Sequence, residues 1–150
     1  MKKQGFTLIE LMVVIVIMGI LAAVAVPKLF GMIAKSKASE VPTAAGTWVN
    51  LFDAYVMEKQ AAGHWGEIGY TAPGTNDNTT SSHTNVIAYS EADNNVWTAK
   101  PKGDLNDCTT SMSWTITPTV DGTKVKYETA ADTQCKSLTP SWDNLSRDTN

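Results

Sequence analysis

An apolar run near the N-terminus constrains this chain more than any other feature. Every residue from Leu11 to Val26 is apolar or small, and counted from Phe6 the segment is 21 residues long. A helix needs about 20 such residues to cross the hydrocarbon core of a membrane. A small domain cannot bury this helix on all sides, so we expect it to lie in lipid or among copies of itself.

Charged residues mark the beginning of the run. Lys2 and Lys3 precede Gly5, which is typical of a short segment that stays on the cytoplasmic side of a membrane. Glu10 is costly there, by about 2.5 to 3.5 kcal/mol for a central and unpaired carboxylate. Cleavage after Gly5 would create an ammonium at Phe6, four residues before Glu10, and the N-terminal end of the helix dipole would also favour the negative charge.

A second apolar pattern follows the run. Apolar side chains recur at helical spacing at Val41, Ala44, Ala45, Trp48, Leu51, Phe52 and Tyr55. We therefore expect a helix from Phe6 to about Gln60, bent at Pro27 and Pro42, because proline lacks a backbone donor and clashes with the preceding turn. The stripe needs a partner, and the chain's own sheet would supply one.

The rest of the chain predicts a small β-rich domain. From Gly63 onwards turn formers are frequent, and Thr71–Asn85 has the composition of a long polar loop. Weak strand signals follow at 86–89 and 96–98, and a hairpin is predicted over 113–129 with its turn at Asp121-Gly122. The expected fold class is α+β, with a long N-terminal helix packed on a small antiparallel sheet.

Two cysteines lie in this polar part, at Cys108 and Cys135. An N-terminal membrane segment would place them outside the cytoplasm, where disulfides persist. We expect them to be paired, with two unpaired buried thiols as the alternative. The chain-entropy model gives about 3.6 kcal/mol of stabilisation for a loop of about 27 residues.

The residues around the start of the run resemble a known signature. It is the prepilin signature of type IV pilins and type II secretion pseudopilins, here read as Lys2-Lys3-Gln4-Gly5, then Phe6-Thr7-Leu8-Ile9-Glu10 and the apolar run. The resemblance covers Lys2 to about Gln60. It implies that a membrane-embedded prepilin peptidase cuts between Gly5 and Phe6 and methylates the Phe6 amine. It also implies that Glu10 pairs with the terminal amine of a neighbouring subunit, since a subunit out of step would leave a costly carboxylate unpaired.

This resemblance divides the chain into four parts. They are a removed leader at 1–5, a transmembrane and assembly half-helix at 6–26, an amphipathic half-helix at 27–62, and a globular head with a disulfide at 63–150. The expected location is the inner membrane, crossed once with the N-terminus in the cytoplasm, and then an extracellular pilus filament.

The function expected from the resemblance is structural. The chain would be a subunit of an extracellular type IV pilus-like filament, with further copies, prepilin peptidase, and pilus or secretion assembly machinery as partners. The alternative is a pseudopilin that aids protein export in a type II secretion system. The predicted disulfide favours the pilin, because many pilins staple their C-terminal region whereas the major pseudopilins generally use calcium. Motility, adhesion and DNA uptake all stay open as uses.

Enzymatic signals are absent from the sequence. His64 and His83 have no neighbouring cysteine or histidine at ligand spacing, and no nucleophile-elbow, phosphate-loop or dinucleotide motif occurs. We expect no enzyme and no cofactor. Asp104, Asn106 and Asp107 form a weak calcium candidate, but the glycine and closing glutamate of an EF-hand loop are missing, so a solvated turn is the competing interpretation.

A second alternative is a secreted carbohydrate-binding module. Ala23-Val24-Ala25 could be an ordinary signal-peptidase site, although Glu10 and the length of the run are atypical of a signal peptide. The module would use exposed tryptophan rings to stack on sugars, and the candidates are Trp65, Trp97 and Trp142. The competing interpretation is that these rings fill a core short of aliphatic residues.

Charge and short motifs add little. The formal net charge is −3 with both signs scattered, which gives no basic face for nucleic acid. Asn78-Thr79-Thr80 and Asn144-Leu145-Ser146 match the glycosylation acceptor pattern, but such matches are common in sequence rich in Thr and Asn.

Overall fold

The computed structural model describes residue 1 and residues 4–149. The chain divides into two compact units, the first ending at Ile33 and the second beginning at Ala34. The first helix, α1 (Leu8–Ala38), forms most of the first unit, and its last turn belongs to the second.

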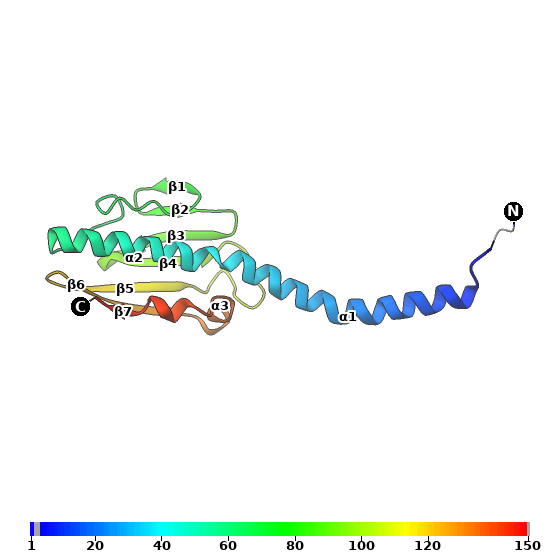
Figure 1. Ribbon diagram of the computed structural model, residues 1–150. Helices are drawn as coiled ribbons and strands as arrows, with labels where there is room; N and C mark the ends of the chain where they lie inside the picture. The colour runs from blue at the N-terminus through cyan, green and yellow to red at the C-terminus, as the bar shows by residue number, and fades with distance from the viewer. Residues whose placement is uncertain (2–3, 150) are drawn as a thin grey trace. The chain divides into compact units, whose positions relative to one another are not determined.

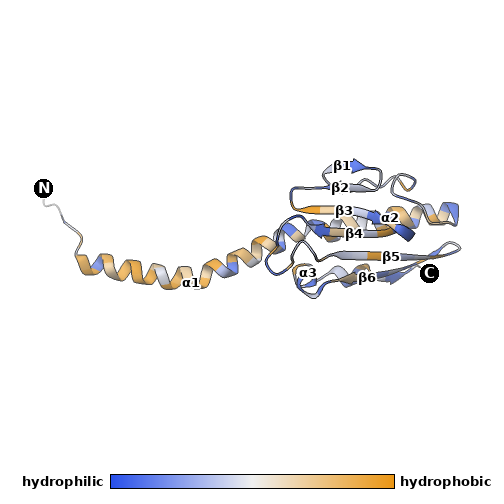
Figure 2. Cartoon of the chain, turned by 180° about the vertical axis from the view of Figure 1, so that it is seen from behind, coloured by the Kyte–Doolittle hydropathy of each residue, from blue (hydrophilic) through white to orange (hydrophobic). Residues whose placement is uncertain are grey.

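The first unit is an apolar helix without a core of its own. Every residue of α1 from Leu8 to Phe30 is exposed, and Figure 2 shows that most of this stretch is coloured as hydrophobic. In the described part of the chain, this helix is long and apolar enough to cross a membrane by length and composition. The exposed apolar surface continues past Val26 to Ile33, so it is longer than the sequence run suggested.

The helix is interrupted near the second predicted bend. Pro27 lies inside α1 without ending it, whereas α1 stops at Ala38 and α2 (Glu40–Lys59) begins after Ser39. Pro42 explains this position, because it cannot donate to the carbonyl of Ala38, four residues back, and its ring crowds that carbonyl. The predicted end near Gln60 is confirmed: Gln60 is left-handed at φ 55° and donates its N–H to the Val56 carbonyl at 2.8 Å.

The second unit contains a seven-stranded antiparallel sheet in which every strand pairs with its neighbours in the sequence. Figure 1 shows α2 lying across this sheet. The strands are β1 (Thr75–Asn78), β2 (Ser81–His83), β3 (Ile87–Ala92), β4 (Val96–Pro101), β5 (Trp114–Asp121), β6 (Lys124–Ala131) and β7 (Arg147–Asp148). Short 3₁₀ helices η1 (Asp93–Asn95) and η2 (Trp142–Leu145) and helix α3 (Thr133–Leu138) complete the unit.

The predicted hairpin and the two weak strands are confirmed. β5 pairs with β6 from Trp114↔Ala131 to Asp121↔Lys124. The turn uses Gly122 at φ 61°, a left-handed conformation that glycine adopts without steric cost. The α+β fold class expected from the sequence is therefore correct.

The expectation of a long polar loop over Thr71–Asn85 is wrong. This segment contains β1 and β2 at one edge of the sheet. The four residues of β1 are all exposed and polar, so no alternation of apolar and polar residues marked the strand. The segment is fastened by Ser82, whose buried hydroxyl donates to the Pro73 carbonyl at 2.8 Å.

The core lies between α2 and the inner face of the sheet. One face of α2 contributes Val41, Ala44, Ala45, Trp48, Val49, Phe52 and Val56. Alternate residues of four strands meet it, namely Ile87, Tyr89, Trp97, Ala99, Trp114, Ile116, Val125 and Tyr127. The rings of Trp48, Phe52 and Tyr127 form a cluster with centroids 5.0 to 6.2 Å apart.

The alternative of exposed stacking rings is wrong, and the competing interpretation, that the tryptophans fill the core, is confirmed. Trp65, Trp97 and Trp142 are at most 2% exposed, and two of them hydrogen-bond through their indole N–H groups. Trp97 donates to the Tyr70 hydroxyl at 3.2 Å and Trp142 donates to the Ala130 carbonyl at 3.1 Å. The rings fill a core with few large aliphatic side chains, so they are not available as a sugar-stacking surface.

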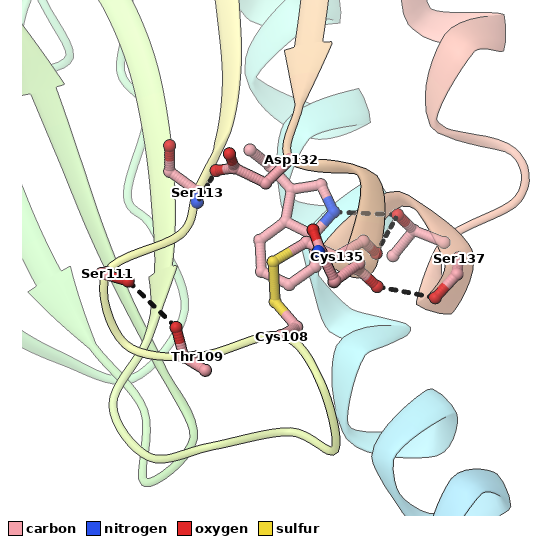
Figure 3. The surroundings of a disulfide bond; sticks show 10 residues. Cys108, Thr109, Ser111, Ser113, Asp132, Cys135 and Ser137 are labelled. Carbon is pink, nitrogen blue, oxygen red and sulfur yellow. Dashed lines mark hydrogen bonds between the residues drawn. A yellow bond between two sulfur atoms is a disulfide. The ribbon is translucent and has the colours of Figure 1, made fainter.

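The predicted disulfide joins Cys108 to Cys135 (Figure 3). Cys108 lies in the loop before β5 and Cys135 lies in α3, and both are fully buried. Beside the bond, Asp132 precedes α3 and accepts a hydrogen bond from the Ser113 N–H at 2.8 Å. The disulfide therefore ties the C-terminal segment across the β5–β6 hairpin, as the sequence predicted.

Three tyrosine hydroxyls attach α2 to the rest of the head. Tyr89 donates to the Glu40 carboxylate at 3.0 Å, Tyr127 donates to Asp53, and Tyr70 donates to the backbone carbonyl of Ala44 at 3.1 Å. Arg147 completes the second contact, because its Nη2 lies 2.7 Å from Asp53 Oδ2. Polar bonds thus hold the helix at its N-terminal end and in its second half.

These contacts keep the tyrosines neutral. Burial is the main reason that the pKa of each is raised, to about 12 for Tyr70. The neighbouring carboxylates of Glu40 and Asp53 raise the pKa of Tyr89 and Tyr127 further, because a tyrosinate would face a like charge.

Removal of the disulfide should destabilise the head. We expect the Cys108→Ala/Cys135→Ala variant to lose about 3.6 kcal/mol of unfolding free energy by the chain-entropy model, since its unfolded chain regains the freedom of the loop. Denaturant unfolding of the full chain in detergent, followed by tryptophan fluorescence, measures this. The reduced wild type is the matched control, and equal stability of oxidised and reduced protein would contradict the prediction.

Alkaline pH should destabilise the head through its tyrosines. An unfolded tyrosine releases its proton near pH 10, whereas Tyr70, Tyr89 and Tyr127 hold theirs to higher pH in the folded head. Their contribution is complete below about pH 10 and is lost as pH rises towards the folded pKa values. We expect Tyr127→Phe to weaken this pH dependence. Tyrosinate absorbance of the folded protein checks it, and ionisation of all tyrosines by pH 11 would refute it.

Candidate assembly site

The first turn of α1 is closed by a reciprocal pair of hydrogen bonds between Thr7 and Glu10. Thr7 Oγ1 accepts from the Glu10 backbone N–H at 3.3 Å, and Glu10 Oε2 accepts from the Thr7 N–H at 2.8 Å. The Thr7 hydroxyl also donates to Glu10 Oε2 at 2.6 Å. This is a capping box, in which the residue before the helix and the third helical residue satisfy each other's free donors.

Only one oxygen of the Glu10 carboxylate is used by these bonds. Within the described residues, Glu10 Oε1 makes no hydrogen bond and no basic side chain forms an ion pair with Glu10. The carboxylate borders a shallow, mostly apolar depression of about 340 Å³, lined by Phe6, Ile9, Glu10, Val13 and Val14. A cation placed there would find a carboxylate oxygen in apolar surroundings, where ion pairing is strong.

The predicted cleavage site lies just outside the helix. Gly5 and Phe6 have no regular secondary structure and are exposed, with Phe6 at 91%. The helix begins at Leu8, so no helical hydrogen bond has to break for a protease to reach the bond between Gly5 and Phe6. The leader lysines Lys2 and Lys3 lie outside the described residues.

The sequence analysis missed the role of Thr7. The pattern Thr-x-x-Glu immediately before an apolar helical run is a signal for a capping box. The sequence-based interpretation related Glu10 to the Phe6 ammonium and to the helix dipole, but not to the Thr7 side chain. The structure gives the carboxylate a second task within its own chain.

The calcium candidate lies in a tight turn. Leu105 and Cys108 exchange backbone hydrogen bonds of 2.9 and 3.2 Å, and Asn106 between them is left-handed at φ 58°. No group of three or more His, Cys, Asp or Glu side chains suited to a metal ion was found among the described residues. The histidines pair with acids instead, His64 with Glu91 and His83 with Asp77.

Comparison with known proteins agrees with this N-terminal geometry. Residues 1–26 match the family described as the prokaryotic N-terminal methylation motif. The segment that contains Gly5, Phe6 and Glu10 thus matches a known N-terminal methylation motif.

The individual relatives are type IV pilus proteins and a type II secretion protein. The chain is 42% identical over 69 residues to the type IV major fimbrial protein FimA of Dichelobacter nodosus, covering 46% of this chain and 44% of the relative. It is 47% identical over 58 residues to the type IV major pilin protein PilA of Myxococcus xanthus, covering 39% and 24%. It is 40% identical over 57 residues to the type II secretion system core protein G of Escherichia coli, covering 38% and 39%. The chain therefore spans less than half the length of each of these relatives.

Loss of the capping box should loosen the start of α1. We expect Thr7→Ala to cost the first turn about 0.5 to 2 kcal/mol, because the Glu10 N–H and the Glu10 carboxylate both lose a partner. Amide hydrogen exchange of residues 8–11 in detergent micelles measures the change. Thr7→Ser keeps the hydroxyl and is the control, and identical exchange in both variants would rule out the capping role.

Proposed function

We propose that this chain is a structural subunit of an extracellular type IV pilus-like filament, polymerised through its N-terminal helix. One observation carries the proposal: α1 exposes apolar side chains on every side, while the head has a closed core of its own. A helix of this kind is stable only in lipid or when covered by other apolar helices. The similarity to type IV fimbrial proteins supports the second environment as the final one.

Processing would prepare the chain for assembly. Prepilin peptidase would cut the exposed bond between Gly5 and Phe6 and methylate the new amine at Phe6, in agreement with the methylation motif at residues 1–26. A methylated amine keeps its positive charge. The mature chain would then begin with a cation two residues before the helix.

Glu10 and Phe6 would set the register between subunits. In our proposal Glu10 Oε2 stays on Thr7 while Oε1, which is unused within the described chain, takes the Phe6 ammonium of a neighbouring copy. A subunit inserted out of step would leave both charges unpaired in an apolar environment, at a cost of several kcal/mol. Pairing therefore selects one register.

Before assembly the chain would be stored in the inner membrane, crossing it once with the N-terminus in the cytoplasm. The parts would then act as expected from the sequence: leader 1–5, membrane and assembly half-helix 6–26, amphipathic half-helix 27–62, and head 63–150. The partners would be other copies of the chain, prepilin peptidase and the assembly machinery. A structural role agrees with the fimbrial relatives and requires no enzymatic activity of the chain itself.

The second candidate is a subunit of a type II secretion system. The similarity to core protein G of such systems favours it. The disulfide of Cys108 with Cys135 favours the pilin, because it already staples the C-terminal segment. Sheared surface filaments would support the pilin, whereas calcium-dependent thermal stability of the head would support the secretion subunit.

Glu10 should be required for assembly and not for processing. In cells of the native host, we expect Glu10→Ala to be cleaved after Gly5 but to be absent from sheared filaments, because the entering amine of the next subunit finds no carboxylate. Intact-mass and N-terminal peptide spectrometry on membrane and filament fractions measures both. Wild-type subunits should begin at methylated Phe6.

Glu10→Asp is the matched control, since it keeps the charge on a shorter side chain and should assemble at a reduced level. Normal filaments of Glu10→Ala would disprove the register role. A wild-type terminus at Val26 would instead indicate ordinary signal cleavage and refute the filament subunit.

A further inference from the structure

Two sites in the head carry the Asn-x-Ser/Thr acceptor pattern. The structure places one of them at the end of a strand and the other in a 3₁₀ helix. Asn78 ends β1 in the connection to β2, and Asn144 lies in η2. Both asparagines are exposed. Exposure alone therefore does not distinguish the two sites. They differ in the hydrogen bonds of the hydroxyl residue two positions after each asparagine, Thr80 and Ser146.

At the second site the hydroxyl is engaged elsewhere. Ser146 Oγ donates to the Tyr127 carbonyl at 3.1 Å, so it does not contact Asn144. The backbone is also fixed, because Asn144 N–H donates to Ser141 and Ser146 N–H donates to Asp143, both at 3.1 Å. A transferase would have to unwind this turn to reach the acceptor conformation.

At the first site both donors of Thr80 point back to the asparagine. The Thr80 N–H donates to Asn78 Oδ1 at 2.9 Å and the Thr80 hydroxyl lies 3.1 Å from the same oxygen. Such an Asx turn is a local side-chain to backbone closure. Two donors on the amide oxygen withdraw electrons from the amide group and make its N–H protons more acidic, which favours the nucleophilic form of the nitrogen. Asn78 Nδ2 makes no hydrogen bond within the described residues.

The site is also open to an enzyme. β1 is the edge strand of the sheet and all four of its residues are exposed (Figure 1). The bulge between Asn76 and Asn78 breaks the regular pairing just before the turn, and bulges turn side chains away from the regular pleat. A saccharide attached here would extend into solvent without displacing any core residue.

We propose that Asn78 is an N-glycosylation site and that Asn144 is not. The amide nitrogen of Asn78 attacks the anomeric carbon of a lipid-linked sugar diphosphate, forming an N–C bond while the bond from that carbon to the phosphate oxygen breaks. The lipid diphosphate leaves with the electron pair, and the nitrogen gives one proton to a base of the transferase. No oxidation or reduction occurs. The lipid-linked sugar is chosen as the donor because the proposed function places the head outside the cytoplasm, so this inference rests on that proposal.

Peptide mass spectrometry on the full chain from its native cells tests this directly. Trypsin should release Asn78 in peptide 60–102, because the bond after Lys100 precedes Pro101, and Asn144 in peptide 137–147. We expect added sugar mass on Asn78, localised by electron-transfer fragmentation, and an unmodified Asn144. Asn78→Gln and Thr80→Ala should lose the sugar, whereas Thr80→Ser and Asn144→Gln should keep it.

The proposal would be overturned by any of four results: an unmodified Asn78 in the wild type, sugar on Thr79 or Thr80, sugar on Asn144, or full modification of Thr80→Ala. Near-UV circular dichroism verifies that the Thr80 variants are folded. Failure here is separate from failure of the filament proposal, because filaments with an unmodified Asn78 would refute the glycan and leave assembly intact.

Discussion

The structure depends on an apolar helix that its own chain does not cover. The free energy of exposing this surface to water is large, since every buried CH₂ group is worth about 0.8 kcal/mol. From Leu8 to Ile33 the helix has no internal partner, so its environment must come from lipid or from other copies. Glu10 is the one carboxylate on this apolar surface, and in the proposed assembly its unused oxygen would favour a partner that brings a cation.

The head holds the amphipathic helix α2 by a buried core and by hydrogen bonds. Aromatic rings fill the space between α2 and the sheet, and tyrosine hydroxyls reach Glu40 in the first turn of α2 and Asp53 in its second half. The buried turn at Ala34 and Ala38 belongs to this same core although it is part of α1. The last turn of α1 is therefore part of the head unit.

Much of this could be predicted from the sequence because the signals were periodic or chemically specific. The helical stripe, the Asp121-Gly122 hairpin and the pairing of the cysteines depend on local spacing or on compartment, and all three are confirmed. β1 and β2 could not be predicted, because neither strand contains an apolar residue: β1 is an edge strand that is exposed throughout, and the buried residue of β2 is Ser82. The tryptophans were ambiguous for another reason: turn-rich sequence around Trp97 and Trp142 did not show that distant strands and helices close over the rings.

The capping role of Thr7 could have been predicted from the sequence. A capping box requires only two side chains at a fixed spacing, so the pair Thr7 and Glu10 can be predicted without knowledge of the tertiary structure. The two roles of Glu10 are compatible, because a carboxylate has two oxygens and the intrachain bonds use only Oε2. The capping box holds the carboxylate through Oε2, so in the proposed assembly a neighbouring ammonium would meet an oxygen already in place. Pre-organisation of this kind lowers the entropy lost on pairing and explains why a hydroxyl residue directly follows the residue that would carry the new terminus.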